Sequence, residues 1–287
     1  MLNKLPIISI KELSYTYPNS TEALRNVNMN IYESELIGIM GKNGAGKTTL
    51  IRTLNGLIQP TKGSIFINGE IIKNKSIATL SKEVGIIFQN PSHQLFANSV
   101  EEEIKFSLKS LNLNKEELNF RVDKILKDFN LEKYRKRSPL NLSGGESKKL
   151  ALASIICRDP KILVFDEPTL GQDAKEINMF INLIKNERKK GKTIIIITHN
   201  VEFAFEYIPR IILMTEGQII ADGPTSKVLN NEILIEKTSL ILPQTRQFVM
   251  KLKESGFPDL DNLISKNQII DYLMKFIRKE KTFIKGI

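Results

Sequence analysis

A glycine-rich loop at residues 41–48, GKNGAGKT, constrains the fold more than any other feature of this chain. An apolar run, Leu36–Met40, precedes the loop, and apolar residues at positions 50, 51, 54 and 57 fit one face of a following helix. Closely folded glycines let backbone N–H groups and the helix N-terminus point at a phosphate, while Lys47 adds positive charge and Thr48 offers a magnesium ligand. A plain strand-to-helix turn is the alternative, but the combined pattern favours a phosphate-binding loop.

Composition sets the class of protein. The 287 residues are 41% hydrophobic, enough for one large or two modest domains with a real core. The single cysteine, Cys157, excludes an internal disulfide and suits a reducing cytosol. We expect no signal peptide and no membrane-spanning segment. The net charge of +10 suits nucleic acid, anionic lipid or nucleotide phosphate, and a solvated basic surface explains it equally well.

Three strand patterns surround the glycine loop. Residues 7–17, the alternating stretch around 27–31 and residues 63–69 predict an antiparallel layer beside the strand at 36–40. Tyr17 lies just upstream of the loop, where its ring can stack on an adenine or fill the core. Another buried strand, 84–88, ends at Gln89.

The block at about 90–141 is polar, lysine-rich and free of strand patterns, and apolar spacing predicts helices over 100–111 and 117–131. A further helix follows Leu142-Ser143-Gly144-Gly145-Glu146. Ser143 and Glu146 fit a capping box. The two glycines disfavour a helix, yet they leave its first amides open to an anion.

Two apolar strands end in polar residues. Residues 162–168 end in Asp166 and Glu167, and residues 192–199 end in His199. Ligands collect at the carboxyl ends of parallel strands, so Asp166 is expected near magnesium and Glu167 near an attacking water, although a helix cap is the simpler alternative. A hairpin is predicted over 208–221. It ends at Asp222-Gly223-Pro224, residues that interrupt regular secondary structure, and helices follow from about 235.

The order and spacing of these motifs resemble the ATP-binding subunit of ABC transporters over residues 7 to about 230. The resemblance implies an α/β fold with a mixed sheet core, an antiparallel β layer and a helical subdomain. We expect an ATP-binding domain at 1–232, with its helical subdomain at about 90–141, and a small helical C-terminal domain at 233–287 that serves dimerisation.

The resemblance also implies the site. Glu167, His199 and Gln89 are the implied catalytic residues, Thr48, Gln89 and Asp166 the implied magnesium ligands, and ATP and Mg²⁺ the cofactors. The implied nucleotide-binding residues come from both halves of an ATP sandwich between two subunits: Tyr17, Gly41, Asn43, Gly44, Gly46, Lys47, Thr48, Thr49, Ser143, Gly144, Gly145 and Asp173.

Residues 88–96, FQNPSHQLF, followed by Val100 and an acidic helix, resemble the A component of energy-coupling factor transporters and their cobalt or nickel relatives, and so does the C-terminal stretch at 240–256. This similarity implies an ATP-hydrolysing importer subunit on the cytoplasmic face of the membrane. Its implied partners are a second ATPase, identical or not, a transmembrane T component and a substrate-binding S component. The sequence departs from the family pattern at Glu146, Leu170 and Gln172, and Glu146 puts a carboxylate near nucleotide.

Other functions remain possible at this level. A soluble ABC ATPase that acts on nucleic acid or ribosomes fits the basic charge, but such proteins usually carry long coiled-coil insertions or two cassettes. We therefore expect no nucleic-acid partner. A regulatory subunit without turnover does not explain Glu167 and His199, and a P-loop kinase or GTPase leaves residues 143–146 unexplained. The sequence does not identify the transported substrate.

Overall fold

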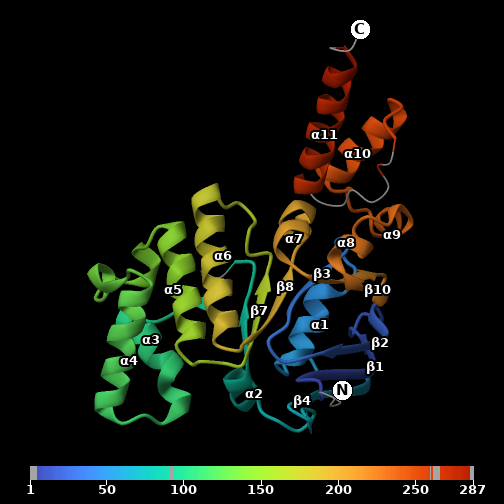
Figure 1. Cartoon of the computed structure of the whole chain (residues 1–287). Helices are drawn as coiled ribbons and strands as arrows, with labels where there is room; N and C mark the ends of the chain where they lie inside the picture. Colours follow the sequence, from blue (N-terminus) through green and yellow to red (C-terminus); the bar gives the residue numbers. More distant parts are fainter. Residues whose placement is uncertain (1–4, 91–93, 259, 261–265, 285–287) are drawn as a thin grey trace.

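Two β-sheets form the centre of the molecule (Figure 1). The computed structural model describes residues 5–90, 94–258, 260 and 266–284. Residues 91–93 of the FQNPSHQLF motif therefore lie outside the described residues. The antiparallel sheet has the order β2-β1-β4-β5, and its strands are β1 (Ile8–Thr16), β2 (Glu22–Ile31), β4 (Lys62–Ile67) and β5 (Glu70–Ile71). It is the predicted antiparallel layer.

The second sheet has the order β10-β9-β3-β8-β7-β6. Its five parallel strands are β3 (Leu36–Met40), β6 (Val84–Ile87), β7 (Ile162–Asp166), β8 (Thr193–Ile197) and β9 (Arg210–Thr215), and β10 (Gln218–Pro224) is the antiparallel edge strand. β3, β7 and β8 are buried at every position, as expected of parallel strands covered on both faces. The predicted mixed sheet is confirmed.

One hydrophobic core lies between the two sheets and encloses α1 (Lys47–Leu54), the helix after the glycine loop. Ile37 and Ile39 of β3 face this core, whereas Leu36 and Met40 face the core on the opposite side of the sheet. This alternation follows from the two-residue repeat of a strand. Short α2 (Ile77–Glu83) leads from the antiparallel sheet into β6.

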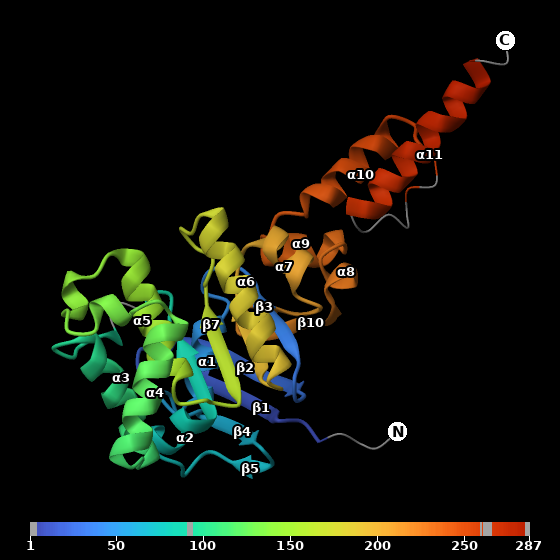
Figure 2. The ribbon, with the colours of Figure 1, turned by 60° about the vertical axis from the view of Figure 1, so that its left-hand side comes forward.

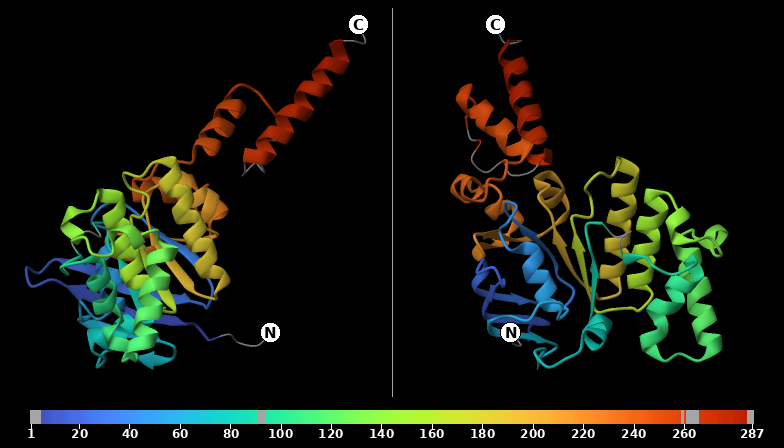
Figure 3. Two further views of the ribbon diagram at one scale, coloured as in Figure 1. Left: turned by 90° about the vertical axis from the view of Figure 1, so that its left-hand side faces the viewer. Right: turned by 180° about the vertical axis from the view of Figure 1, so that it is seen from behind.

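Helices cover the other face of the parallel sheet. They are α3 (Val100–Leu108), α4 (Lys115–Asp128), α5 (Gly144–Ile156), α6 (Ala174–Lys189) and α7 (Val201–Tyr207). α3 and α4 make up the predicted helical block and stand to one side of the sheets (Figures 1 and 3). The segment between β7 and β8 contains α6, for which we made no prediction. Its apolar residues Ile177, Phe180, Ile181 and Ile184 have helical spacing, so the signal is present.

The C-terminal part divides into two packing environments. α8 (Thr225–Val228) and α9 (Glu232–Thr238) pack on the main core through Leu229 and Ile235. α10 (Gln244–Glu254) and α11 (Lys266–Ile284) project away from the main body (Figure 2). They share a separate small cluster built on Val249, Leu260 and Ile269. α9, which begins at Glu232, packs on the main core. The division expected at residue 233 stays a prediction.

Candidate functional site

The glycine loop joins β3 to α1 and curls around the amine of Lys47. This lysine is buried, and its Nζ donates to the carbonyl oxygens of Gly41 (2.8 Å) and Lys42 (3.0 Å). Burial lowers the pKa of Lys47, and the carboxylates of Glu167 and Asp166 oppose that shift. The loop therefore combines a cation with the N-terminus of α1, which is an arrangement that can hold phosphate.

Asp166 lies at the carboxyl end of β7, opposite Thr48. The Thr48 hydroxyl donates to Oδ2 of Asp166 over 3.4 Å. Burial raises the pKa of Asp166, as does the charge of Glu167, whereas the Thr48 hydrogen bond and the charges of Lys47 and Arg52 lower it. The net effect is a raised pKa of Asp166, which the nearby cations only reduce.

The Thr48 and Asp166 oxygens fit a hard divalent cation. Among the residues that the structure describes, no group of three or more His, Cys, Asp or Glu side chains could hold a metal. Mg²⁺ suits such a site, because it commonly takes one or two protein oxygens and fills its octahedron with phosphate oxygens and water. Thr48 and Asp166 can therefore hold Mg²⁺ that arrives with a nucleotide.

Glu167 and His199 are joined by a direct contact. His199 Nδ1 lies 2.8 Å from Oε1 of Glu167, and the His199 backbone N–H donates to Oε2 over 3.4 Å. Asp166 pairs with Ile197 in the parallel register, so the chain ends that follow β7 and β8 come together. Glu167 has a φ of +51°, and its N–H donates to the Ile197 carbonyl over 2.9 Å. Such unfavourable backbone geometry is concentrated at functional sites.

Tyr17 and Gln89 both adjoin this group. The Tyr17 hydroxyl is 3.0 Å from the Thr49 hydroxyl in the first turn of α1, and its ring packs edge-on against Tyr15. Gln89 is exposed just beyond β6 and lines the same cavity as Asp166 and Glu167. Adenine stacking by Tyr17 and the catalytic role of Gln89 stay predictions.

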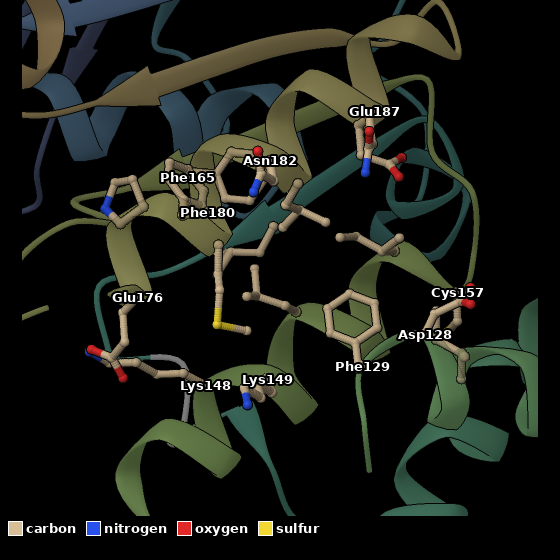
Figure 4. Close-up of a pocket in the computed structure, with 18 of the residues that line it drawn as sticks. Asp128, Phe129, Lys148, Lys149, Cys157, Phe165, Glu176, Phe180, Asn182 and Glu187 are labelled. Carbon is tan, nitrogen blue, oxygen red and sulfur yellow. The ribbon is translucent and has the colours of Figure 1, made fainter. Parts of the chain in front are cut away.

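That cavity has a volume of about 1150 Å³ and lies among α4, α5, α6 and the ends of β6 and β7. Figure 4 shows its interior, where Phe129, Phe165 and Phe180 contribute an apolar surface. Lys148 of α5 and Glu176 of α6 lie at one side of it. The cavity separates the helical block from the sheet beside the Asp166 and Glu167 carboxylates.

The Ser143–Glu146 segment begins α5. The Ser143 hydroxyl accepts from the Glu146 N–H, and the Glu146 carboxylate accepts from the Ser143 N–H over 2.9 Å, which confirms the predicted capping box. A hydrogen bond from Tyr134 and the Ser143 backbone bond hold the pKa of Glu146 at about 2. Glu146 is therefore an anion at neutral pH.

The predicted site residues form two groups. Hydrogen bonds or ion pairs join Thr48 to Asp166 and Glu167 to His199, and chain adjacency joins Lys47 to Thr48 and Asp166 to Glu167. Gly41 and Tyr17 adjoin this group through Lys47 and Thr49. Gly44 and Asn43 lie exposed on the loop beside Gly46. Ser143, Gly144 and Gly145 form the second group, which makes no hydrogen bond or ion pair to the first within the described ranges. Asp173 caps α6 by accepting from the Glu176 N–H over 2.8 Å.

The sequence analysis missed the β9–β10 turn as part of the site. The Gly217 N–H donates to the Ala45 carbonyl in the glycine loop (3.2 Å), and the Gly217 carbonyl accepts from the Arg25 N–H of β2 (2.9 Å). Glu216 lies 3.9 Å from the amine of Lys42. The turn itself was predicted, but its position against the loop is a long-range contact that local patterns do not reveal.

Comparison with known proteins identifies related sequences. Residues 24–170 match the ABC transporter family. The chain is 36% identical over 253 residues to the energy-coupling factor transporter ATP-binding protein EcfA of Methanothermobacter thermautotrophicus, with 88% of this chain and 81% of that protein covered. It is 37% identical over 278 residues to EcfA2 of Acetivibrio thermocellus, with 95% and 99% covered.

Some relatives are much longer. The chain is 38% identical over 266 residues to a putative ABC transporter ATP-binding protein of Methanosarcina mazei, and the match covers 93% of this chain but 45% of that protein. A second such protein, from Methanosarcina acetivorans, is covered over 44% of its length. The chain thus spans about half the length of these two relatives.

Solved structures give the same result. The structure of cbiO1 from Clostridium perfringens, described as part of the ABC transporter complex cbiONQ, superposes with a TM-score of 0.71 at 34% identity, covering 85% of this chain and 99% of that one. A dimeric ATP-binding cassette in a post-hydrolysis state, bound to ADP and phosphate, gives a TM-score of 0.68 at 28% identity, covering 76% and 98%.

Proposed function

Because the chain belongs to the ABC transporter family, we propose that it is an ATP-hydrolysing subunit that energises an importer of the energy-coupling factor type. The contact between Glu167 and His199 carries the catalytic part of this proposal. It fixes a carboxylate directly beside Asp166, which faces the phosphate-binding loop through Thr48. The similarity to EcfA, EcfA2 and cbiO1 supports the transport part.

In the proposed reaction, the P-loop amides and Lys47 bind the phosphates of ATP. Thr48 and Asp166 would hold Mg²⁺, which neutralises charge on the phosphates when it is bound. Glu167 positions and deprotonates the attacking water, and His199, held by Glu167, contacts the terminal phosphate. Gln89 contacts the metal or the water, and Tyr17 stacks on the adenine.

The second half of the site is proposed to come from another subunit. Ser143, Gly144 and Gly145 lie at the N-terminus of α5, where free amides and the helix dipole attract an anion. Among the described residues, they form no hydrogen bond or ion pair with the P-loop group of their own chain, so two chains placed head to tail would complete each site. Asp173 then lies at the contact between the two sites. The second chain is either identical or a homologue.

We further propose membrane partners. No described helix is long and apolar enough to cross a bilayer. A transmembrane T component and a substrate-binding S component would complete the importer, with this chain as a peripheral subunit on the cytoplasmic face. ATP binding closes the pair of ATPases, closure moves the Gln89 region against the T component, and hydrolysis reopens the pair. A vitamin, cobalt or nickel fits this scheme as cargo.

The C-terminal helices are proposed to contribute to pairing. Among the side chains described in this part of the chain, their cluster holds three buried ones, Val249, Leu260 and Ile269, with partly buried neighbours. α11 also presents an exposed apolar stripe, in which Ile270 is 47%, Met274 50% and Ile277 49% exposed. These residues have helical spacing of four and three, so they share one face. Such a face is typical of a surface that a second copy or a homologue covers.

Glu167→Gln tests the proposal. The amide keeps the shape of the side chain but loses the base, so the rate of ATP hydrolysis should fall about 100-fold or more while ATP binding persists. Glu236→Gln, at an exposed position of α9, is the matched control. With ATP, the Glu167→Gln chain should also remain in a closed pair of ATPases. It should copurify from solubilised membranes with a second ATPase and a multi-helix membrane protein. Unchanged turnover would refute the role of Glu167, and recovery of ribosomes or nucleic acid would refute the transport role.

A further inference from the structure

Glu103 of α3 is a buried carboxylate that is satisfied by backbone amides. Its residue is 3% exposed, and Oε2 accepts from the N–H groups of Phe96 (3.0 Å) and Ala97 (2.9 Å). Within the described ranges, no Lys, Arg or His forms an ion pair with Glu103. A buried charge without a counterion is costly unless charge-assisted hydrogen bonds compensate. Such a group indicates a position where a specific backbone conformation must be held.

The held segment connects Gln89 to α3. Phe96 is 65% exposed and packs edge-on against Phe106 of α3, which is 54% exposed, with ring centroids 4.7 Å apart. Glu103 and Phe106 are one helical turn apart. Both contacts therefore attach residues 96–97 to the same helix.

The first turn of α3 is attached in turn to the segment that precedes α5. The Val100 N–H donates to the Arg137 carbonyl and the Glu101 N–H to the Arg135 carbonyl, each over 3.0 Å. The Arg135 guanidinium also pairs with Glu101 and with Asp123 of α4. The free amides at the start of α3 thus fix the chain at 135–137.

The chain at 134–137 leads directly into the Ser143–Glu146 segment. The Arg137 guanidinium lies 5.6 Å from the centroid of the Tyr134 ring, and a short turn, in which the Leu142 N–H donates to the Pro139 carbonyl over 3.2 Å, joins Arg137 to Ser143. The Tyr134 hydroxyl also lowers the pKa of Glu146. A hollow of about 360 Å³ lies between the two sides, and Gln89 and Leu95 line it together with Leu142 and Gly144. The Gln89 segment and the Ser143–Glu146 segment therefore face each other across the hollow and are joined through α3.

We propose that Glu103 is a positioning residue that couples the Gln89 side of the site to the Ser143–Gly145 side. Its carboxylate holds residues 96–97 against α3 through two hydrogen bonds. The first turn of α3 in turn donates to the carbonyls of the 135–137 segment, which leads into Ser143–Glu146. A displacement at the exposed Phe96–Phe106 pair then moves the helix start that completes the second ATP site. The importance of this coupling for transport rests on the proposed function, but the connection is a property of the isolated chain.

Hydrogen–deuterium exchange on the full-length chain tests this connection. Glu103→Ala removes the acceptor of the Phe96 and Ala97 amides, so exchange in peptides that cover residues 94–99 should rise about tenfold or more. The proposal predicts a second rise, at least threefold, in peptides covering 134–147. Glu102→Ala, an exposed neighbour in the same turn of α3, is the matched control and should change neither region.

Glu103→Gln keeps one acceptor oxygen, so it tests the proposal even if the Glu103→Ala chain does not fold. It should give the same two-region pattern at smaller amplitude, with exchange in β8 unchanged, and Glu103→Asp should restore most of the protection. A rise confined to 94–99 would overturn the proposal, because it would show a local contact without coupling. No rise at 94–99 would also overturn it. The exchange experiment does not depend on ATP hydrolysis. If the expected exchange pattern were found in a chain that does not hydrolyse ATP, the proposed function would be contradicted and the coupling through Glu103 would stand.

Discussion

The two halves of the nucleotide site differ in how completely one chain builds them. The P-loop half is enclosed: Lys47 and Asp166 are buried, and contacts within the chain orient Thr48, Glu167 and His199. The Ser143–Gly145 half is an exposed helix start that makes no such contacts with the first. The folding of one chain therefore sets the geometry of the first half, whereas the second half is proposed to bind ATP only when another subunit approaches it.

Matched glycine substitutions should separate the two halves most strongly. A Cβ at Gly41 would lie 2.0 Å from the Met214 carbonyl oxygen at a φ of +145°, whereas a Cβ at Gly144 would meet nothing within 4 Å. Gly41→Ala should therefore lower the melting temperature by about 6 °C or more and abolish ATP binding. Gly144→Ala should leave ATP binding by the monomer unchanged and should not lower the melting temperature, because the added Cβ meets nothing within 4 Å and alanine is the better helix former.

Hydrolysis gives the second measurement for this pair. The added methyl group at position 144 would obstruct the close approach of the α5 amides to the phosphates of ATP bound by a second subunit. The rate of ATP hydrolysis should therefore fall about tenfold or more. If Gly144→Ala hydrolyses ATP at the wild-type rate, the α5 helix start is not part of a shared site, and the comparison between the two halves fails.

The exposed stripe on α11 tests whether a second chain is held near before ATP arrives. Met274→Glu puts a charge at the centre of the stripe without disturbing the cluster of Val249, Leu260 and Ile269. The dissociation constant of the nucleotide-free pair should rise about tenfold or more, because the charge must be desolvated on pairing. Sedimentation velocity measures the constant, and Lys275→Glu, an exposed α11 neighbour, is the control. An unchanged constant would exclude this stripe from the interface.

Glu146→Gln sharpens the comparison from the second half. The pKa of Glu146 is held at about 2, so its carboxylate adds negative charge beside the open amides at every pH near neutrality. The amide should strengthen ATP-dependent pairing about two- to fivefold at low salt, and the gain should shrink at high salt because the charge is screened. Stability should fall slightly, since a neutral amide caps Ser143 less strongly. A gain that is independent of salt would show that the charge is not its cause.

The sequence predicted that Asp166, Glu167 and His199 lie at the ends of two buried strands, and the roles given to these residues stay predictions. The pairing of Glu167 with His199 follows from the adjacency of β7 and β8. The capping box of Ser143 and Glu146 is local and was also confirmed. Glu103, in contrast, follows Glu101 and Glu102 in the sequence, and nothing in its spacing distinguishes it from them. Its burial depends on the backbone of residues 96 and 97, and the approach of Gly217 to the P-loop is likewise a tertiary contact that spacing does not encode.

Asp166→Asn tests the energetic cost of the enclosed half. Burial raises the pKa of Asp166 in the folded chain, so the ionised carboxylate destabilises the fold at pH values above the folded pKa, and the cost disappears below the unfolded pKa of about 4. The asparagine variant should therefore melt about 1–3 °C higher than wild type at pH 8, and the difference should shrink as the pH approaches 4. Asp271→Asn, exposed on α11, should give no such gain. Meanwhile the extra stabilisation that ATP with Mg²⁺ gives over ATP alone should be lost, since a carboxylate ligand is gone. A variant that melts lower at pH 8 would show that Thr48 and the nearby cations outweigh burial, and that this half of the site is stable without its ligand.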